Sequence, residues 1–397
     1  MPALPPPLLA DLPRRHEKLR AATRAAGADA LLLTLNTDLL YAAGTVFAGW
    51  CYLPAEGAPL FFYRRPADFA DRLPGFAAVA VRRPDQIAAH LAGTGRPPPA
   101  RLLLEGDELP AAEWFQLARL FPQTELLNGS TAIRAARAVK TGYELGRMRE
   151  SCRRHAEAVA AFPALYRPGM NERDFSVALE QAVRLRGGLG LMRAFGGRLE
   201  IFVGSVLAGD NADAPSAYDF ALGGAGMDPS LPVGSCGAPL RPGTTVMADV
   251  SGNFTGYVSD CSRTYVVGTV PERVRRAHDV SIDICEAIAA AGVPGARCDA
   301  LYALALQRAE AAGLSDHFMG FTQRAKFVGH GVGLEINELP VLAARSETTL
   351  AADMTLALEP KFVFPGVGAV GIENTYAVTE SGLEKLTCCD EALVTLA

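Results

Sequence analysis

Two aspartates, Asp249 and Asp260, lie within residues 245–267, in two segments rich in residues that favour β-strands. Two glycines and an asparagine between the segments favour a turn, so the stretch predicts a β-hairpin. If the turn is centred near Phe254 and Thr255, the aspartates face each other with Cβ atoms about 5 Å apart. Carboxylates this close repel each other unless a cation lies between them, and they suit one divalent ion or a pair. Taken alone, the aspartates are equally consistent with an exposed hairpin that carries two solvated carboxylates.

Three later residues favour the metal site over the solvated hairpin. His330 has a glycine on each side, and glycines let a backbone approach a ligand closely. Glu359 and Glu373 lie in a second pair of β-patterned segments whose midpoint is Gly366, so a second hairpin is predicted to place two carboxylates at opposed positions. Four carboxylates and one imidazole form a ligand set for Mn, Fe, Co or Zn in a dinuclear site.

At these residues the chain resembles the pita-bread metallopeptidases, which include methionine aminopeptidase, prolidase, Xaa-Pro aminopeptidase and the metal-free creatinase. The metal ligands of that family are Asp, Asp, His, Glu and Glu, in that order. The local sequences SDCSRT, GHGVGLE, LEP and GIEN match its motifs, and the spacings are similar to those of its prolidase branch. The resemblance implies that two divalent ions (Mn, Co, Fe or Zn) bind to five side chains: Asp249, Asp260, His330, Glu359 and Glu373.

The resemblance also implies a role for each ligand. Asp249 would bind one ion with both of its oxygens, Asp260 and Glu373 would bridge the two ions, and His330 and Glu359 would complete the second ion. A water that bridges the ions would attack the scissile amide, because metal binding makes water a nucleophile at neutral pH. Glu359 would then act as the general base.

Two histidines that contact the substrate in peptidases of this family are replaced in this chain. One normally precedes the first aspartate, but no histidine lies between His155 and His278. The other belongs to a His-Glu-x-Pro element, and here the sequence NELP places Asn337 at that position. We predict that Asn337 takes part in catalysis as a hydrogen-bond donor, although it cannot exchange a proton near neutral pH. Glu338, in the same element, either orients a ligand or belongs to the turn at the end of a strand.

Composition excludes several other classes of protein. The chain has 397 residues, of which 49% are hydrophobic and 20% charged, and its net charge of −5 gives no basic footprint for nucleic acid. No apolar run reaches the roughly 18 residues that cross a bilayer. No basic segment precedes an apolar one at the start of the chain, as it would in a signal peptide. The eight cysteines have no metal-binding spacing and indicate reduced thiols. We therefore expect a cytoplasmic protein that binds neither nucleic acid nor membranes.

Two domains are expected, at residues 1–138 and 139–397. In the first, predicted strands alternate with helices, which favours an α/β domain. The first helix is predicted at residues 14–27, and residues 36–44 are predicted to form a loop. This order resembles the N-terminal domain of the creatinase and prolidase branch, where the domain helps to form a homodimer and covers the active site. The second domain resembles the pita-bread catalytic domain, so the expected fold class is α/β (α+β).

The sequence is consistent with three functions. The first is a homodimeric metallohydrolase that resembles Xaa-Pro dipeptidases and aminopeptidases and acts on dipeptides. The second is an enzyme with the same fold and metals that acts on a small non-peptide substrate, as a C–N hydrolase or a lyase. The third is a binding module without turnover. The replaced histidines count against an ordinary peptidase, and the retained ligand set counts against a binding module.

Overall fold

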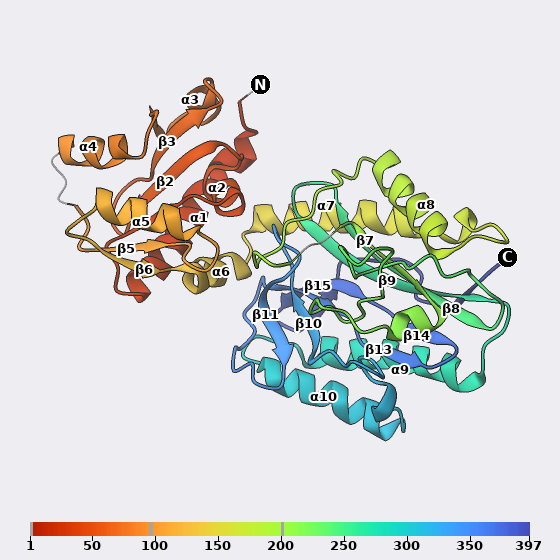
Figure 1. Cartoon of the computed structure of the whole chain (residues 1–397). Coiled ribbons are helices and arrows are strands. Elements are labelled where there is room, and N and C mark those ends of the chain that lie inside the picture. The colour runs from red at the N-terminus through yellow and green to blue at the C-terminus, as the bar shows by residue number, and fades with distance from the viewer. Residues whose placement is uncertain (1–2, 95–97, 200–201) are drawn as a thin grey trace. The chain divides into compact units, whose positions relative to one another are not determined.

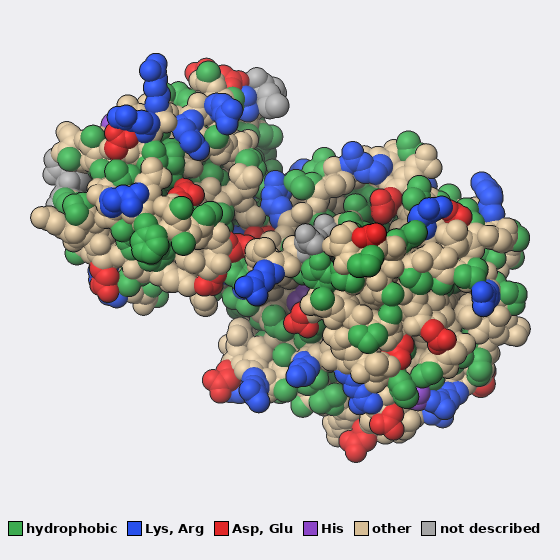
Figure 2. All heavy atoms as spheres, in the orientation of Figure 1, with side chains coloured by type: hydrophobic (Ala, Val, Ile, Leu, Met, Phe, Trp, Pro, Cys, Tyr) green, Lys and Arg blue, Asp and Glu red, His purple; other side chains and the backbone are tan. Residues whose placement is uncertain are grey.

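The computed structural model describes residues 3–94, 98–199 and 202–397 (Figure 1). Contacts divide the chain into two compact units. Unit 1 comprises Met1–Arg137 and Phe195–Gly197, and unit 2 comprises Ala138–Ala194 and Arg198–Ala397. Both units combine helices with β-sheets, so the predicted mixed α/β class is confirmed. Among the described residues, no helix has the length and apolar character needed to cross a membrane. On the face drawn in Figure 2, Lys and Arg side chains are interspersed with Asp and Glu.

Unit 1 is built around a six-stranded mixed sheet in the order β4-β3-β2-β1-β5-β6. The pairs β1–β2 and β2–β3 are antiparallel, whereas β3–β4, β1–β5 and β5–β6 are parallel. Its strands are β1 (Ala30–Leu33), β2 (Ala48–Pro54), β3 (Leu60–Arg65), β4 (Ala77–Ala80), β5 (Arg101–Leu104) and β6 (Glu125–Asn128). The helices of this part of the chain are α1 (Pro6–Ala25), α2 (Asn36–Ala43), α3 (Phe69–Arg72), α4 (Asp85–Gly93), α5 (Ala111–Leu120) and α6 (Ser130–Ala138).

Two helices of unit 1 differ from the sequence prediction. Helix α1 begins at Pro6, well before the predicted start at residue 14, because prolines are tolerated in the first helical turn, where an N–H group has no partner in the helix. The predicted loop after β1 is instead the helix α2, which ends at Gly44 with a φ of 70°. Leu39 and Tyr41 are buried, so tertiary packing rather than intrinsic propensity stabilises this short helix.

Unit 2 contains three sheets. A five-stranded sheet has the order β11-β10-β12-β15-β16, a four-stranded sheet has the order β17-β9-β8-β7, and β13 and β14 form a separate pair. The strands are β7 (Gly204–Ala208), β8 (Thr244–Asn253), β9 (Val258–Val267), β10 (Phe327–Gly331), β11 (Glu338–Ala343), β12 (Thr355–Leu358), β13 (Lys361–Phe364), β14 (Gly368–Gly371), β15 (Asn374–Thr379), β16 (Gly382–Lys385) and β17 (Val394–Leu396).

Two pairs of helices cover these sheets from opposite sides (Figure 1). Helix α7 contacts β8 and β9, and α8 contacts β7, whereas α9 contacts β13, β14 and β16, and α10 contacts β11. These helices are α7 (Gly142–Val159), α8 (Glu172–Leu185), α9 (Glu272–Ala291) and α10 (Cys298–Ala311), and the short 3₁₀ turns are η1 (Pro163–Leu165), η2 (Gly209–Asp213) and η3 (Ser315–His317). The sheets therefore lie between two helical layers.

Each helical layer of unit 2 has its own hydrophobic core. Beneath α9 and α10, Ile284 and Ile288 pack in one cluster with Leu356 and Phe362. A second cluster joins α8 to β8 and β9. Full burial of an aliphatic or phenyl side chain contributes roughly 1.5–3 kcal/mol. Apolar packing on both sides holds the strands rigidly, and this rigidity fixes the polar side chains that lie between the two layers.

Candidate metal centre

The structure brings all five predicted ligands together in unit 2, although they come from distant parts of the chain. Each lies on a strand or at a strand end: Asp249 on β8, Asp260 on β9, His330 on β10, Glu359 directly after β12 and Glu373 directly before β15. Four of the five side chains are at most 14% exposed, and Asp249 is 27% exposed. A cluster of acidic groups this deeply buried needs compensating positive charge.

The register of the first hairpin differs from the prediction. Asp260 pairs with Ser251, and Asp249 pairs with Ser262, so the two aspartates are not directly opposed. The reason is the loop between β8 and β9, whose Gly256 has a φ of 90° and donates its N–H to Asn253 Oδ1 at 2.9 Å. The loop is therefore centred later than predicted. Because the offset is two residues, the aspartates stay on one face of the sheet as diagonal neighbours.

Two serines fill the positions opposite the aspartates, and the sequence analysis missed both. Ser251 donates its hydroxyl to Asp260 Oδ1 at 2.9 Å, and Ser262 donates to Glu373 Oε2 at 2.6 Å. Both serines are buried. Their positions two residues from an aspartate on the same strand place them on the ligand face, and this spacing could have identified them. They orient two carboxylates and leave the other oxygens free for a cation.

The second hairpin has the predicted register. Leu358 pairs with Asn374 on one side of the two glutamates, and Lys361 pairs with Gly371 on the other. Both pairs belong to the same register, which continues through the short gap between the β12–β15 and β13–β14 pairings. Within the gap, the Glu359 N–H donates to the Val328 carbonyl at 3.0 Å and the Glu373 N–H donates to the Ser262 carbonyl at 3.1 Å. The prediction that Glu359 and Glu373 lie at opposed positions is confirmed.

The imidazole of His330 is oriented for ligation. Its Nδ1 lies 3.1 Å from the Gly331 carbonyl, which can only accept, so Nδ1 carries a hydrogen and Nε2 faces the carboxylates. Nε2 lies 3.3 Å from Glu359 Oε1 and 3.9 Å from Asp260 Oδ2. Burial alone would lower the pKa of His330, but the contact with Glu359 and the charge of Asp260 raise it to about 9. A proton or a metal ion at Nε2 satisfies this arrangement.

A lysine also enters the centre, and the sequence analysis missed it. Lys361 is completely buried, and its Nζ lies 2.8 Å from Asp249 Oδ2, 2.8 Å from Glu359 Oε2 and 3.3 Å from Glu373 Oε2. Burial alone would lower the pKa of this ammonium, but the three carboxylates raise it well above its usual value. Residues two apart in an extended segment point to the same face, so the sequence Glu-Pro-Lys contained the signal.

The ligand atoms form two overlapping groups that could each hold a cation. One group consists of Asp260, His330 and Glu373, and the other consists of Asp249, Glu359 and Glu373. Within each group the ligand atoms lie within 4.8 Å of one another. The first group, with two carboxylates and an imidazole, fits a divalent transition metal. One oxygen of each carboxylate in the second group bonds the Lys361 ammonium.

The carboxylates have too little positive charge around them when the protein groups are considered alone. Burial, and then the charge of Asp249, raise the pKa of Asp260 to about 6. Burial and the charge of Asp260 raise the pKa of Glu373 well above its usual value. Burial would also raise the pKa of Glu359, but Lys361 and His330 lower it to about 2. Counted with the imidazole neutral, as it is when it binds a metal, four carboxylates and one ammonium have a formal charge of −3, and this charge favours a bound cation.

The neighbour of Asn337 has a structural partner. Glu338 accepts a hydrogen bond from Lys140 at 2.8 Å, and both side chains are buried. Its second oxygen accepts the Leu334 N–H at 3.0 Å. Glu338 therefore anchors the start of β11 to the segment before α7. Asn337 directly precedes β11 and is half-buried. Its catalytic role stays a prediction.

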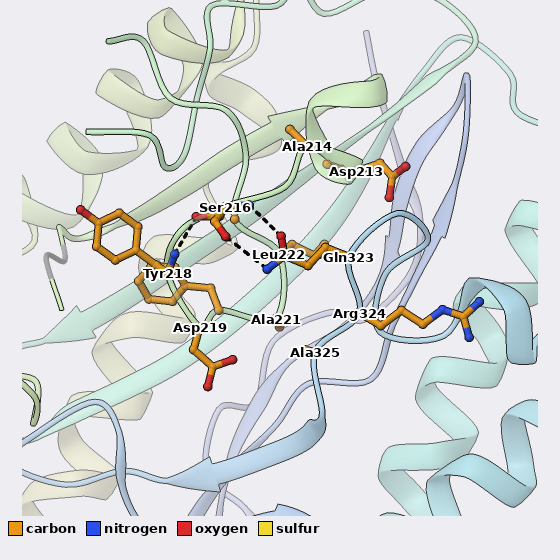
Figure 3. A pocket seen from close by; sticks show the side chains of 13 residues that line it. Asp213, Ala214, Ser216, Tyr218, Asp219, Ala221, Leu222, Gln323, Arg324 and Ala325 are labelled. Atoms are coloured by element: carbon orange, nitrogen blue, oxygen red, sulfur yellow. Dashed lines mark hydrogen bonds between the residues drawn. The ribbon is translucent and has the colours of Figure 1, made fainter. Parts of the chain in front are cut away.

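A small hollow lies between two loops of unit 2 (Figure 3). The Ser216 N–H donates to Gln323 Oε1 at 3.1 Å, and Gln323 Nε2 donates to the Ser216 carbonyl at 3.2 Å. Tyr218 lines the same hollow. Its volume of about 30 Å³ is too small for a dipeptide, since ligand pockets usually measure about 300–1,000 Å³. These contacts tie the loop that carries Ser216 to the segment that leads into β10, the strand that carries His330.

Comparisons with known proteins agree with this geometry. Residues 146–380 match metallopeptidase family M24, and residues 15–139 match the Creatinase/Prolidase N-terminal domain. The "Xaa-Pro dipeptidase" of Pyrococcus furiosus is 27% identical over 263 residues, which are 66% of each chain. The "Probable dipeptidase PepE" of Mycobacterium bovis is 27% identical over 393 residues, which are 96% of each chain.

Among solved structures, an Xaa-Pro dipeptidase from Bacillus anthracis has the same fold. The TM-score is 0.80 at 24% identity, over 97% of this chain and 100% of that chain. The order of the two matched domains is the order that the sequence motifs predicted. Because the M24 match covers more than half of the sequence, the chain belongs to metallopeptidase family M24, as a prolidase-like member with the pita-bread fold.

Proposed function

We propose that the protein is a metal-dependent hydrolase that cleaves dipeptides of the Xaa-Pro type. The observation that carries this proposal is the convergence of Asp260, His330 and Glu373, with ligand atoms within 4.8 Å of one another in a buried site. All three groups are oriented by hydrogen bonds, Asp260 by Ser251, Glu373 by Ser262 and His330 by the Gly331 carbonyl. Side chains oriented in this way support a ligand set over a chance cluster of charges.

Each side chain of the centre would have a distinct role in the reaction. A divalent ion supplies the Lewis acidity that lets water attack an amide carbon at neutral pH. The sequence predicts two such ions, held by the five ligands. Lys361 and His330 hold the Glu359 carboxylate in its ionised form, and Glu359 would accept the proton of the attacking water as general base. Asn337 would donate a hydrogen bond from its side-chain amide to the developing oxyanion.

A second candidate function has the same metal centre but a different class of substrate. Asn337 stands where peptidases of this family carry a histidine, so proton delivery to a leaving amine is weakened. A small non-peptide substrate that needs no such proton would suffer less, in a C–N hydrolase or a lyase reaction. A binding module without turnover is the least favoured function, because such a module gains nothing from four carboxylates held close together in a buried site.

Metal analysis combined with a substrate panel tests the proposed function. Protein purified with Mn²⁺ or Co²⁺ and freed of excess ions is expected to retain stoichiometric metal. It should hydrolyse Xaa-Pro dipeptides in preference to matched Xaa-Ala and Pro-Xaa controls. A chelator should remove the activity, and the same ion should restore it. Protein that retains no metal and cleaves no member of the panel would contradict the proposal.

We propose that the protein is a cytoplasmic homodimer, in which residues 1–138 serve assembly and residues 139–397 serve catalysis. The support comes from the Creatinase/Prolidase match at residues 15–139, since none of the five ligands lies in that range. Light scattering is expected to give about twice the chain mass of 42.0 kDa. A monomer at micromolar concentration would refute the dimer and leave the proposed catalysis untouched.

A further inference from the structure

Through its ammonium, Lys361 contacts all three residues of one of the two potential metal groups. Its ammonium has three N–H donors, and the three nearest acceptors are carboxylate oxygens of Asp249, Glu359 and Glu373. These are the same three residues that form the second potential metal group. An ion held by the same three carboxylates would place a like charge beside the ammonium, in a largely buried site.

The backbone fixes the lysine in this place. Lys361 is the first residue of β13, two residues after Glu359, so both side chains point to the ligand face. Its direct partner across the hairpin is Gly371, which has a φ of 146°. A Cβ atom at position 371 would lie 2.4 Å from the Pro360 carbonyl oxygen and 3.0 Å from the Lys361 Cα. Glycine at this position therefore lets the two backbones approach beside the lysine.

The other group has less contact with the lysine. Among the described residues, the Lys361 ammonium bonds neither Asp260 nor His330, and its contact with Glu373 Oε2 is the longest of the three, at 3.3 Å. With one divalent ion in this group and the ammonium beside it, the centre with its four carboxylates would have a formal charge of −1. The ammonium thus supplies the positive charge that a second ion would otherwise provide.

We propose that the Lys361 ammonium replaces one of the two divalent ions, so that the protein binds a single ion at Asp260, His330 and Glu373. The proposal rests on the proposed function, because it concerns the same centre. It changes the predicted stoichiometry and gives Asp249 a different role. Asp249 and Glu359 hold the lysine, and the lysine in turn fixes the position of the Glu359 carboxylate beside His330.

Metal stoichiometry tests this proposal without an activity assay. Wild-type protein saturated with Mn²⁺ and freed of excess ions is expected to contain one ion per chain by elemental analysis. Its electron paramagnetic resonance spectrum should be that of an isolated Mn²⁺ ion rather than a magnetically coupled pair. Lys361→Met removes the ammonium, keeps an unbranched side chain, and is expected to raise the capacity to two ions per chain. Lys326→Met, an exposed lysine changed in the same way, serves as the control and should retain one ion.

Each outcome supports or overturns the proposal. Two ions in the wild type, or a single ion in a folded Lys361→Met variant, would overturn it and leave the proposed hydrolase intact. No ion in the wild type would overturn both proposals. If Lys361→Met fails to fold, Lys361→Gln keeps hydrogen-bond donors without the charge and takes its place. The wild-type stoichiometry and spectrum decide between one ion and two even without a folded variant.

Discussion

Asp260→Asn is expected to weaken Mn²⁺ binding at least about 100-fold, a change of roughly 2.7 kcal/mol in binding free energy. The carboxylate of Asp260 belongs to the group of three side chains that we propose as the metal site. Asparagine has nearly the same shape and can still accept the hydrogen bond from Ser251, so the change removes charge and leaves the packing in place. Equilibrium dialysis or titration calorimetry with Mn²⁺ measures the effect, and Xaa-Pro hydrolysis should fall in parallel.

Asp249→Asn is the matched control for Asp260→Asn. Both residues lie on the same hairpin and lose the same charge, but Asp249 belongs to the group bonded to Lys361. We expect the affinity for the first ion to fall about tenfold, an effect of the size seen when a group that only orients a ligand is changed. Equal losses in the two variants would show that both aspartates bind the metal. Stoichiometric Mn²⁺ in Asp260→Asn would show that the ion lies elsewhere.

The second hairpin could be predicted from sequence because its turn lies at the midpoint of its two glutamates. The first could not, because Asn253 and Gly256 move the loop along the chain and shift the pairing by two residues. The predicted placement of both aspartates on one face of the hairpin is nevertheless correct. A shift of two preserves the face on which a side chain lies, whereas a shift of one would have reversed it.

Two of the residues that sequence reasoning missed bond partners that are far away in the chain. The Lys361 ammonium bonds Asp249, 112 residues away, and the Ser262 hydroxyl bonds Glu373, 111 residues away. A lysine in a β-patterned segment predicts an exposed position, because lysine is seldom fully buried unless it is paired. Glu359 is close to Lys361 in sequence, but only the fold brings Asp249 to the ammonium. Motif order located the candidate ligands, and tertiary contacts determine which of them the lysine bonds.

The helix α2 was missed for a similar reason. Its eight residues, beginning with Asn36, read as a loop because Asn, Thr and Asp favour turns and helix caps over helix interiors. In the structure Thr37 and Asp38 are buried, and Asp38 accepts a hydrogen bond from Arg137 at 2.6 Å. A buried ion pair and apolar packing therefore override the local preference, and neither is visible in a window of eight residues.

The last expected result concerns Asn337. Asn337→His should raise kcat for Xaa-Pro dipeptides by roughly 10²–10⁴-fold, the usual contribution of a positioned acid–base group. An imidazole can pass a proton to the leaving amine, whereas the amide of asparagine can only donate a hydrogen bond. The gain should appear in kcat more than in KM, because the proton is transferred in the transition state.

Asn337→Gln is the control for this change, since it keeps an amide at the same position and adds no proton donor. Glu338 and Lys140 stay unchanged in both variants, so the anchor of β11 is preserved and thermal unfolding should match that of the wild type. A wild-type kcat already on the order of 10 s⁻¹, near the median for enzymes, would mean that another group delivers the proton. An increase of the same size in Asn337→Gln would mean that side-chain length, rather than proton transfer, limits the reaction.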